Sequence, residues 1–181
     1  LSLSVKTRTG FNTPDMSWIE FLLGHDLDML IIHGRTKKQM SDVPADWGFI
    51  GRARELRDRL ALGTLLVGNG DVESRAQGIE LAERHGLDGI MIGRGVFHDP
   101  FVFAPESPWT DYGEEQKIGL YRRHVELFDK TWQGRERHIH TLNKFCKIYI
   151  NNFDGAKELR ERLMAAASAD ELLSIMDAEA A

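Results

Sequence analysis

Two glycine-rich segments carry the residues of this chain that are best suited to bind a charged ligand. Gly68-Asn69-Gly70-Asp71 follows the apolar run 65–67, and Gly93-Arg94-Gly95 follows the apolar run 90–92. A short apolar run that stops at glycine is typical of a buried strand that opens into a tight loop. Glycine lets backbone N–H groups approach an anion closely, and arginine adds a forked positive charge. The two segments therefore predict a phosphate-binding site.

Two earlier apolar runs end in cationic side chains in the same way. Lys6 and Arg8 close the first run, and His33 and Arg35 follow the second. Parallel α/β sheets bind their ligands at the carboxyl ends of the strands, so we expect these cations to meet the glycine loops at one sheet edge. Lys6 would face inward and need an anionic partner, either a bound ligand or, alternatively, a salt bridge with a strand-end carboxylate such as Asp71.

Helical segments separate these four strands. The predicted strands cover 3–8, 27–32, 64–67 and a run that ends at Gly93, and Thr13 and Pro14 mark the start of the first helix. The predicted helices cover 13–23, 49–60 and 73–85. Four strand-helix units with apolar strands indicate a parallel α/β sheet. Because a complete (β/α)8 barrel needs about 250 residues, we predict about half of such a barrel, with unpaired outer strands.

The pattern changes after Pro100. Apolar positions at helical spacing predict helices over 114–132, 138–152, 155–167 and 169–178. We therefore predict a partial barrel domain at 1–105 and a small all-helical domain at 106–181. The chain has a net charge of −5, but residues 121–162 hold ten Lys or Arg against six Asp or Glu. A local excess of cations suits a polyanion, although it is at least as common on an ordinary solvated surface.

Composition excludes several classes of protein. No apolar run approaches the roughly 20 residues that span a bilayer. A single cysteine, Cys146, excludes internal disulfides and fits a reducing compartment, so we expect a cytoplasmic protein. His138 and His140 have no cysteine or carboxylate cluster nearby, so we predict no metal site. The chain begins at Leu1 within a strand pattern, from which we expect a piece of a longer, processed or renumbered chain.

These motifs, in order and in spacing, resemble a known enzyme family. The flavin-barrel signature of the tRNA-dihydrouridine synthases is similar to Val5-Lys6-Thr7-Arg8-Thr9-Gly10, Ile32-His33-Gly34-Arg35-Thr36, Gly68-Asn69-Gly70-Asp71-Val72 and Met91-Ile92-Gly93-Arg94-Gly95. The segments 144–150 and 155–160 resemble that family's C-terminal RNA-binding domain. The resemblance covers nearly the whole chain. It implies an α/β fold that is the second half of a (β/α)8 TIM barrel, with four parallel strand-helix units, followed by the helical domain.

The resemblance also implies a reaction and a set of binding residues. FMN would bind at the barrel mouth, NADPH would be the reductant, and a uridine of tRNA would accept a hydride at C6 and a proton from a cysteine at C5. The residues that it assigns to the cofactor are Lys6, His33, Asn69, Gly70, Asp71, Gly93 and Arg94. The residues assigned to the substrate or tRNA are Arg35, Lys144, Lys147, Arg160 and Arg162.

The catalytic cysteine is the main departure from the family pattern. In the family it lies in the first barrel half, upstream of the position that matches Lys6, and we interpret Cys146 as a buried structural thiol. We therefore expect this chain to be inactive alone and to pair with a missing N-terminal barrel half or a second copy. Two alternatives stay open: a barrel flavoenzyme for a small metabolite, similar to dihydroorotate dehydrogenase, and a non-catalytic tRNA-binding fragment.

Overall fold

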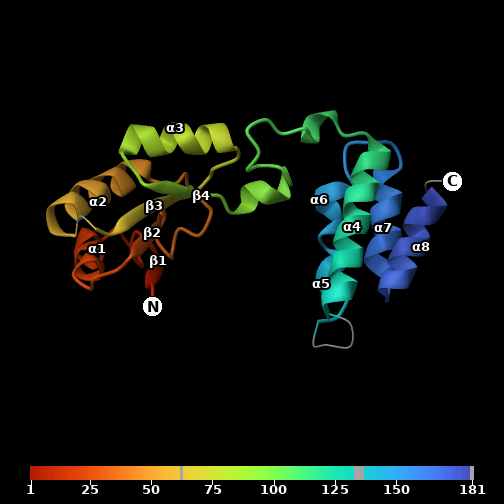
Figure 1. The fold of residues 1–181 in the computed structure, drawn as a ribbon, viewed down its shortest axis with the longest axis horizontal. Coiled ribbons are helices and arrows are strands. Elements are labelled where there is room, and N and C mark those ends of the chain that lie inside the picture. Colours follow the sequence, from red (N-terminus) through yellow and green to blue (C-terminus); the bar gives the residue numbers. More distant parts are fainter. Residues whose placement is uncertain (62, 133–136, 180–181) are drawn as a thin grey trace. The chain divides into compact units, whose positions relative to one another are not determined.

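The computed structural model describes residues 1–61, 63–132 and 137–179 (Figure 1). The chain divides into two compact units, Leu1–Ser107 and Pro108–Ala181, whereas the sequence prediction placed the boundary between residues 105 and 106. Within the described residues, no helix combines the length and the apolar character that a membrane crossing requires.

The first unit is a parallel sheet whose strands alternate with helices. The strands pair in the order β1-β2-β3-β4, all of them parallel (Figure 1). This arrangement confirms the predicted α/β class with four parallel strand-helix units. The elements are β1 (Ser4–Arg8), α1 (Met16–Leu23), β2 (Met29–His33), α2 (Trp47–Leu60), β3 (Leu65–Asn69), α3 (Arg75–His85), β4 (Gly89–Met91) and the 3-10 helix η1 (Arg94–Phe97).

The hydrophobic core of this unit lies on one face of the sheet. Alternate strand residues, Leu30, Ile32 and Leu66, pack against helices α1 and α2, whose Ile19 and Ile50 are fully buried. Side chains alternate between the two faces of a strand, so the residues between these point to the other face. The sheet therefore has one face covered by its own helices and one that carries Lys6, Arg8, His33 and Asn69.

Several predicted element ends differ from the observed ones. Helix α1 starts at Met16 and not at Thr13, because the Asp15 side chain caps it by accepting hydrogen bonds from the N–H groups of Ser17 and Trp18. Helix α3 starts after the cap Ser74 for the same reason. Strand β4 ends at Met91, two residues before the predicted Gly93.

The second unit is all-helical and has its own core. Its elements are the 3-10 helix η2 (Trp109–Asp111), α4 (Glu114–Trp132), α5 (His140–Asn143), α6 (Cys146–Tyr149), α7 (Ala156–Ala165) and α8 (Ala169–Glu179). Tyr121 and Val125 of α4 pack with Leu159 and Leu163 of α7, and all four are at most 1% exposed. Helix α4 has the predicted bounds because its apolar positions repeat at helical spacing throughout.

The single helix predicted over 138–152 is wrong. The structure has two four-residue helices there, α5 and α6. Asn143, which is 3% exposed, donates its side-chain N–H to the carbonyl of Ala166 beyond the end of α7. Asn151 donates to the carbonyls of Lys147 and Ile148 at the end of α6. The Asn151 bonds, to carbonyls three and four residues earlier, are of the local kind that competes with a continuing helix.

Candidate functional site

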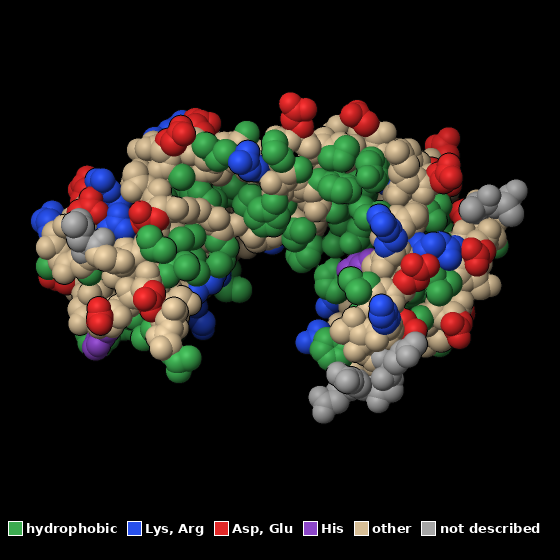
Figure 2. Space-filling model, viewed as in Figure 1, with side chains coloured by type: hydrophobic (Ala, Val, Ile, Leu, Met, Phe, Trp, Pro, Cys, Tyr) green, Lys and Arg blue, Asp and Glu red, His purple; other side chains and the backbone are tan. Residues whose placement is uncertain are grey.

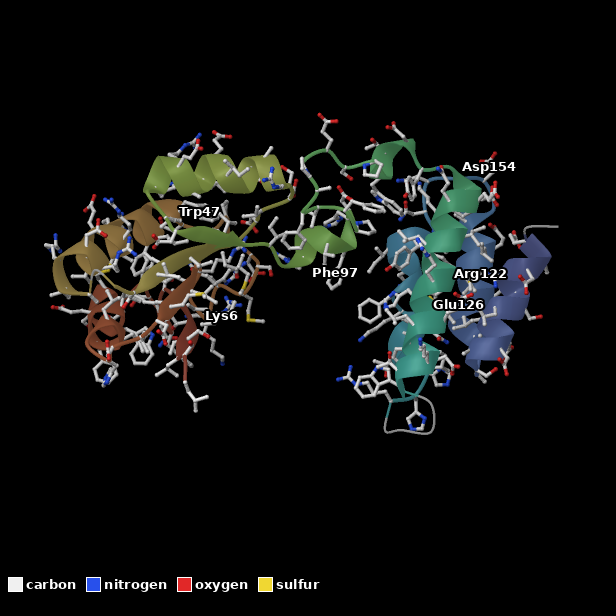
Figure 3. The ribbon with its side chains drawn as sticks, in the orientation of Figure 1. Lys6, Trp47, Phe97, Arg122, Glu126 and Asp154 are labelled. Carbon is white, nitrogen blue, oxygen red and sulfur yellow. The ribbon has the colours of Figure 1, made fainter. Side chains whose placement is uncertain are left out.

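The register of the sheet aligns the ends of three strands. Arg8 of β1 pairs with His33 of β2, and His33 pairs in turn with Asn69 of β3. Residues in one register row of a parallel sheet share a face, and Lys6, two residues before Arg8, lies on that face as well. Figure 3 shows Lys6 on the opposite side of the sheet from Trp47, which packs against the helix-covered core. The strand ends therefore present their polar side chains together.

These side chains border a hollow of about 410 Å³, which we call the rim pocket. A hollow of this size lies within the range of small-molecule sites. All seven residues that the resemblance assigns to the cofactor line the rim pocket. The ends of the four strands therefore meet at this pocket. The lining residues are Lys6, Arg8, His33, Asn69, Gly70, Asp71, Val72, Glu73, Gly93, Arg94, Gly95 and His98.

The two glycine loops give the rim pocket an open backbone surface. Gly70 has φ +135, and a Cβ at this position would lie 2.5 Å from the Ala45 Cβ, so only glycine fits here. At Gly93 an added Cβ would meet no atom within 4 Å, so its backbone borders open space. Asn69 fastens the two strands by donating its Nδ2–H to the Met91 carbonyl at 2.7 Å. This pair of loops can place backbone N–H groups close to an anion.

The surroundings of His33 favour its neutral form and keep it neutral even in mildly acidic solution. Burial lowers the pKa of His33, and the neighbouring Arg8, Lys6 and Arg35 lower it further, to about 4, although Asp71 acts in the opposite direction. Although the Lys6 residue is largely exposed, partial burial of its charged group and the neighbouring Arg8 also lower the pKa of Lys6. A neutral imidazole offers one donor and one acceptor to a ligand instead of a third strand-end cation.

Asp71 is the most connected side chain of the rim pocket. Its Oδ2 accepts from Arg35 Nη2 at 2.6 Å and from the backbone N–H of Ala45 at 2.9 Å, and its Oδ1 lies 3.4 Å from Arg94 Nη2. Burial alone would raise the pKa of Asp71, but these three partners outweigh it and hold the pKa below its ordinary value. The carboxylate is therefore ionised and already surrounded by donors.

The structure gives Lys6 and Arg35 different surroundings. Lys6 is exposed and Asp71 bonds to Arg35 and Arg94, so the alternative Lys6–Asp71 salt bridge does not form. Arg35 is only 3% exposed, and its Nε–H donates to the Val43 carbonyl. In this position Arg35 supports the loop that follows β2, and its role toward the substrate or tRNA stays a prediction.

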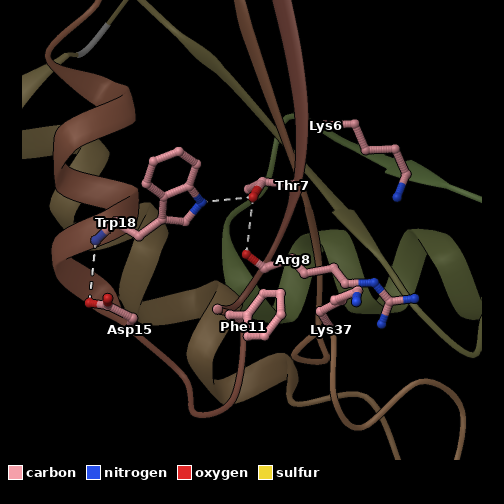
Figure 4. Close-up of a pocket in the computed structure, with 8 residues that line it drawn as sticks. Lys6, Thr7, Arg8, Phe11, Asp15, Trp18 and Lys37 are labelled. Atoms are coloured by element: carbon pink, nitrogen blue, oxygen red, sulfur yellow. Dashed lines mark hydrogen bonds between the residues drawn. The ribbon is translucent and has the colours of Figure 1, made fainter.

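A second hollow shares Lys6 and Arg8 with the rim pocket and is larger, about 670 Å³ (Figure 4). It borders β1, an outer strand of the described sheet, and Trp18 closes one side by donating its Nε1–H to Thr7 Oγ1 at 2.9 Å. Aromatic side chains line it and only one glycine does. Because it lacks the paired glycine loops, we place the anion site in the rim pocket despite the difference in volume.

The cations of the second unit are dispersed. Lys144 and Lys147 are exposed, Arg160 is half-buried and donates to the Ile150 carbonyl, and Arg162 pairs with Glu179 at 2.7 Å. On the face drawn in Figure 2, basic and acidic side chains alternate over this unit. Cys146 is fully buried, and burial raises the pKa of its thiol, in agreement with a structural role.

Sequence reasoning missed several residues that line the rim pocket. His98 follows η1, and Glu73 precedes α3, outside the four motifs. Neither lies at the end of a predicted strand, so the strand pattern does not point to them. Arg8 does lie at a strand end and lines the pocket, although the resemblance does not assign it to the cofactor.

Comparison with known proteins identifies relatives along the entire chain. The family model described as "Dihydrouridine synthase (Dus)" matches residues 1–181. A "Probable tRNA-dihydrouridine synthase" of Staphylococcus epidermidis is 42% identical over 179 residues, which are 98% of this chain and 54% of the relative. The "Probable tRNA-dihydrouridine synthase 2" of Bacillus subtilis is 41% identical over the same shares. The chain therefore spans about half the length of these curated relatives.

Proposed function

The chain belongs to the dihydrouridine synthase family, and from this premise we propose that it supplies the FMN-binding and tRNA-binding portion of an enzyme that reduces uridine in tRNA to 5,6-dihydrouridine with NADPH. The observation that carries the proposal is the convergence of the four family motifs on the rim pocket. Bound FMN would carry electrons from NADPH to the uracil ring.

The donor set of the rim pocket fits the phosphate end of FMN. Gly70 and Gly93 expose backbone, and Arg94, whose side chain is 60% exposed, offers a guanidinium that a phosphate can pair with. Asn69 holds the two loops at a fixed separation through its bond to Met91. These residues would bind the phosphate and the ribityl chain.

Lys6 and His33 would serve the ring end of the cofactor. Lys6 supplies a cation from β1 for the electron-rich pyrimidine edge of the flavin. His33, kept neutral by burial and by its cationic neighbours, can hydrogen-bond to the flavin or to the flipped uracil without adding charge.

The catalytic acid would come from outside these 181 residues. Cys146, the single cysteine of the sequence, is buried in the core of the helical unit with a raised pKa, so it cannot donate a proton to a substrate. We propose that the chain alone does not complete the reaction. It would need a first barrel half that pairs with β1 or, failing that, a second copy of the chain.

The helical unit would dock the tRNA. Lys144 and Lys147 lie on α5–α6 and are exposed, and Arg162 is on the exposed surface of α7. Exposed cations on a separate compact unit suit the phosphate backbone of a folded RNA, while the base itself enters the pocket.

Titration with FMN and with riboflavin, which lacks the phosphate, tests the cofactor part of the proposal. We expect the chain to bind FMN more tightly than riboflavin, and Arg94→Gln to weaken FMN about tenfold, or about 1.4 kcal/mol, with little effect on riboflavin. Arg59→Gln, which removes an exposed arginine from α2, is the matched control. Equal affinities for the two flavins, with no response to Arg94→Gln, would contradict the proposal.

A further inference from the structure

We infer that Asp71 is a positioning residue that aims Arg94 at the ligand phosphate and fastens the loop after β2, instead of binding the cofactor itself. The inference deepens the proposed function and rests on it. It also revises the cofactor role that the sequence resemblance implies for Asp71.

The carboxylate is occupied on the side of the protein. Oδ2 accepts two hydrogen bonds, from Arg35 Nη2 and the Ala45 N–H, and Oδ1 faces Arg94 Nη2. A carboxylate that also faced a phosphate would repel it, since like charges at short range are unfavourable. As a partner of two guanidinium groups, the same carboxylate holds the cations in place and offsets part of their mutual repulsion.

Three hydrogen bonds fix the loop of residues 36–46 that follows β2. Arg35 donates to the Val43 carbonyl, Asp71 accepts from Ala45, and Arg94 Nη1 donates to Ser41 Oγ at 3.2 Å. The two arginines that hold the loop are the two that Asp71 holds. The carboxylate therefore joins the loops that follow β2, β3 and β4 into one network, which we call the Asp71 clamp.

The backbone at Asp71 supports this assignment. Its φ is +52, in the left-handed region that most side chains avoid and that Asp, Asn and Gly tolerate best. This conformation follows Gly70, whose φ is also positive. The chain thus turns sharply after β3 and directs the carboxylate toward Arg35 and Ala45. Asn and Gly are accordingly the two replacements that keep the backbone and change only the side chain.

The decisive experiment compares Asp71→Asn with Glu73→Gln, which removes the same charge from the same pocket without touching the clamp. We expect Asp71→Asn to lose about fivefold or more in FMN affinity, to keep its riboflavin affinity, and to exchange the Ala45 amide hydrogen faster. Glu73→Gln should bind FMN more tightly, because it removes a repulsive charge from the lining of the pocket. Asp71→Gly, which takes away the acceptor altogether, should increase the Ala45 exchange rate most.

Each other outcome overturns the inference in a distinct way. If Asp71→Asn weakens FMN and riboflavin equally and leaves Ala45 exchange unchanged, Asp71 binds the ribityl chain that the two flavins share. If Asp71→Asn binds FMN as Glu73→Gln does, the carboxylate positions nothing. If the chain binds neither flavin, the proposed function is contradicted. The clamp is tested separately, because an unchanged Ala45 exchange rate in Asp71→Gly would contradict it whether or not flavin binds.

Discussion

The two units of this chain use positive charge in different ways. In the first unit, Lys6 and Arg8 of β1 and Arg94 of η1 border one pocket, and the buried Arg35 bonds to Asp71 of the same pocket. In the second unit Lys144 and Lys147 are exposed at the surface, and Arg162 pairs there with Glu179. The side chains of Arg122 and Glu126 likewise extend from α4 (Figure 3). Convergent cations suit a small anion of fixed shape, whereas dispersed cations suit a long polyanion.

The units also have separate hydrophobic cores, so they can be perturbed one at a time. Leu163→Ala empties a fully buried site in the helical unit, and Ile50→Ala does so beneath the sheet. We expect each to cost about 2–5 kcal/mol of unfolding free energy in its own unit. Amide hydrogen exchange, read unit by unit, measures the loss. If either variant reduced protection from amide exchange equally in both units, the division into two separate cores would be contradicted.

A backbone change tests the glycine loop of the first unit. Gly70→Ala should destabilise that unit by about 1–3 kcal/mol, because alanine is strained at φ +135 and its Cβ would meet the Ala45 Cβ at 2.5 Å. Gly63→Ala is the control, since nothing lies within 4 Å of an added Cβ there. Denaturant unfolding, monitored through the amide signals of the first unit, gives the difference in unfolding free energy. Equal effects of the two variants would contradict the close approach between residue 70 and the Ala45 Cβ.

The stability of the first unit should depend on pH through the titration of His33. The folded pKa is about 4 and the unfolded value 6.5, so the unfolded chain binds the proton more readily between these values. Stability from this residue is therefore complete above about pH 6.5 and is lost as the pH falls toward 4. Denaturant unfolding of wild type and His33→Gln across this range checks it. We expect a flatter profile for His33→Gln, and an unchanged profile would contradict the assigned environment.

The smallest expected effect falls on the dispersed cations. Lys144→Ala combined with Lys147→Ala should weaken tRNA binding by a few-fold and reduce its salt dependence by about one to two ion equivalents. Flavin affinity should not change. Gel-shift titrations at several salt concentrations, with Arg59→Gln as the control, provide the measurement. An undiminished salt slope would place the RNA elsewhere and weaken the contrast between the units.

The features that sequence could predict were the local ones. Apolar runs located the four strands, and because parallel strands end at one sheet edge, the motifs at their ends had to meet there. The regular apolar spacing of α4 gave its bounds. The register row through Arg8, His33 and Asn69 then explains why these side chains share a face.

The features that escaped prediction depend on contacts between residues far apart in sequence. Arg35 and Asp71 are 36 residues apart, and nothing in either motif shows that they bond to each other and not to a ligand. Asn143, at the end of α5, likewise donates to the carbonyl of Ala166, 23 residues away at the end of α7. Helical spacing alone cannot reveal such long-range capping.

Mapping FMN onto the chain by amide NMR shifts tests the central claim most directly. We predict that FMN shifts the amides of Gly70, Gly93 and Arg94, and that riboflavin shifts these amides much less because it has no phosphate. Shifts that cluster instead around Phe11 and Trp18, in the larger hollow beside β1, or in the helical unit would contradict the assignment of the rim pocket as the phosphate site.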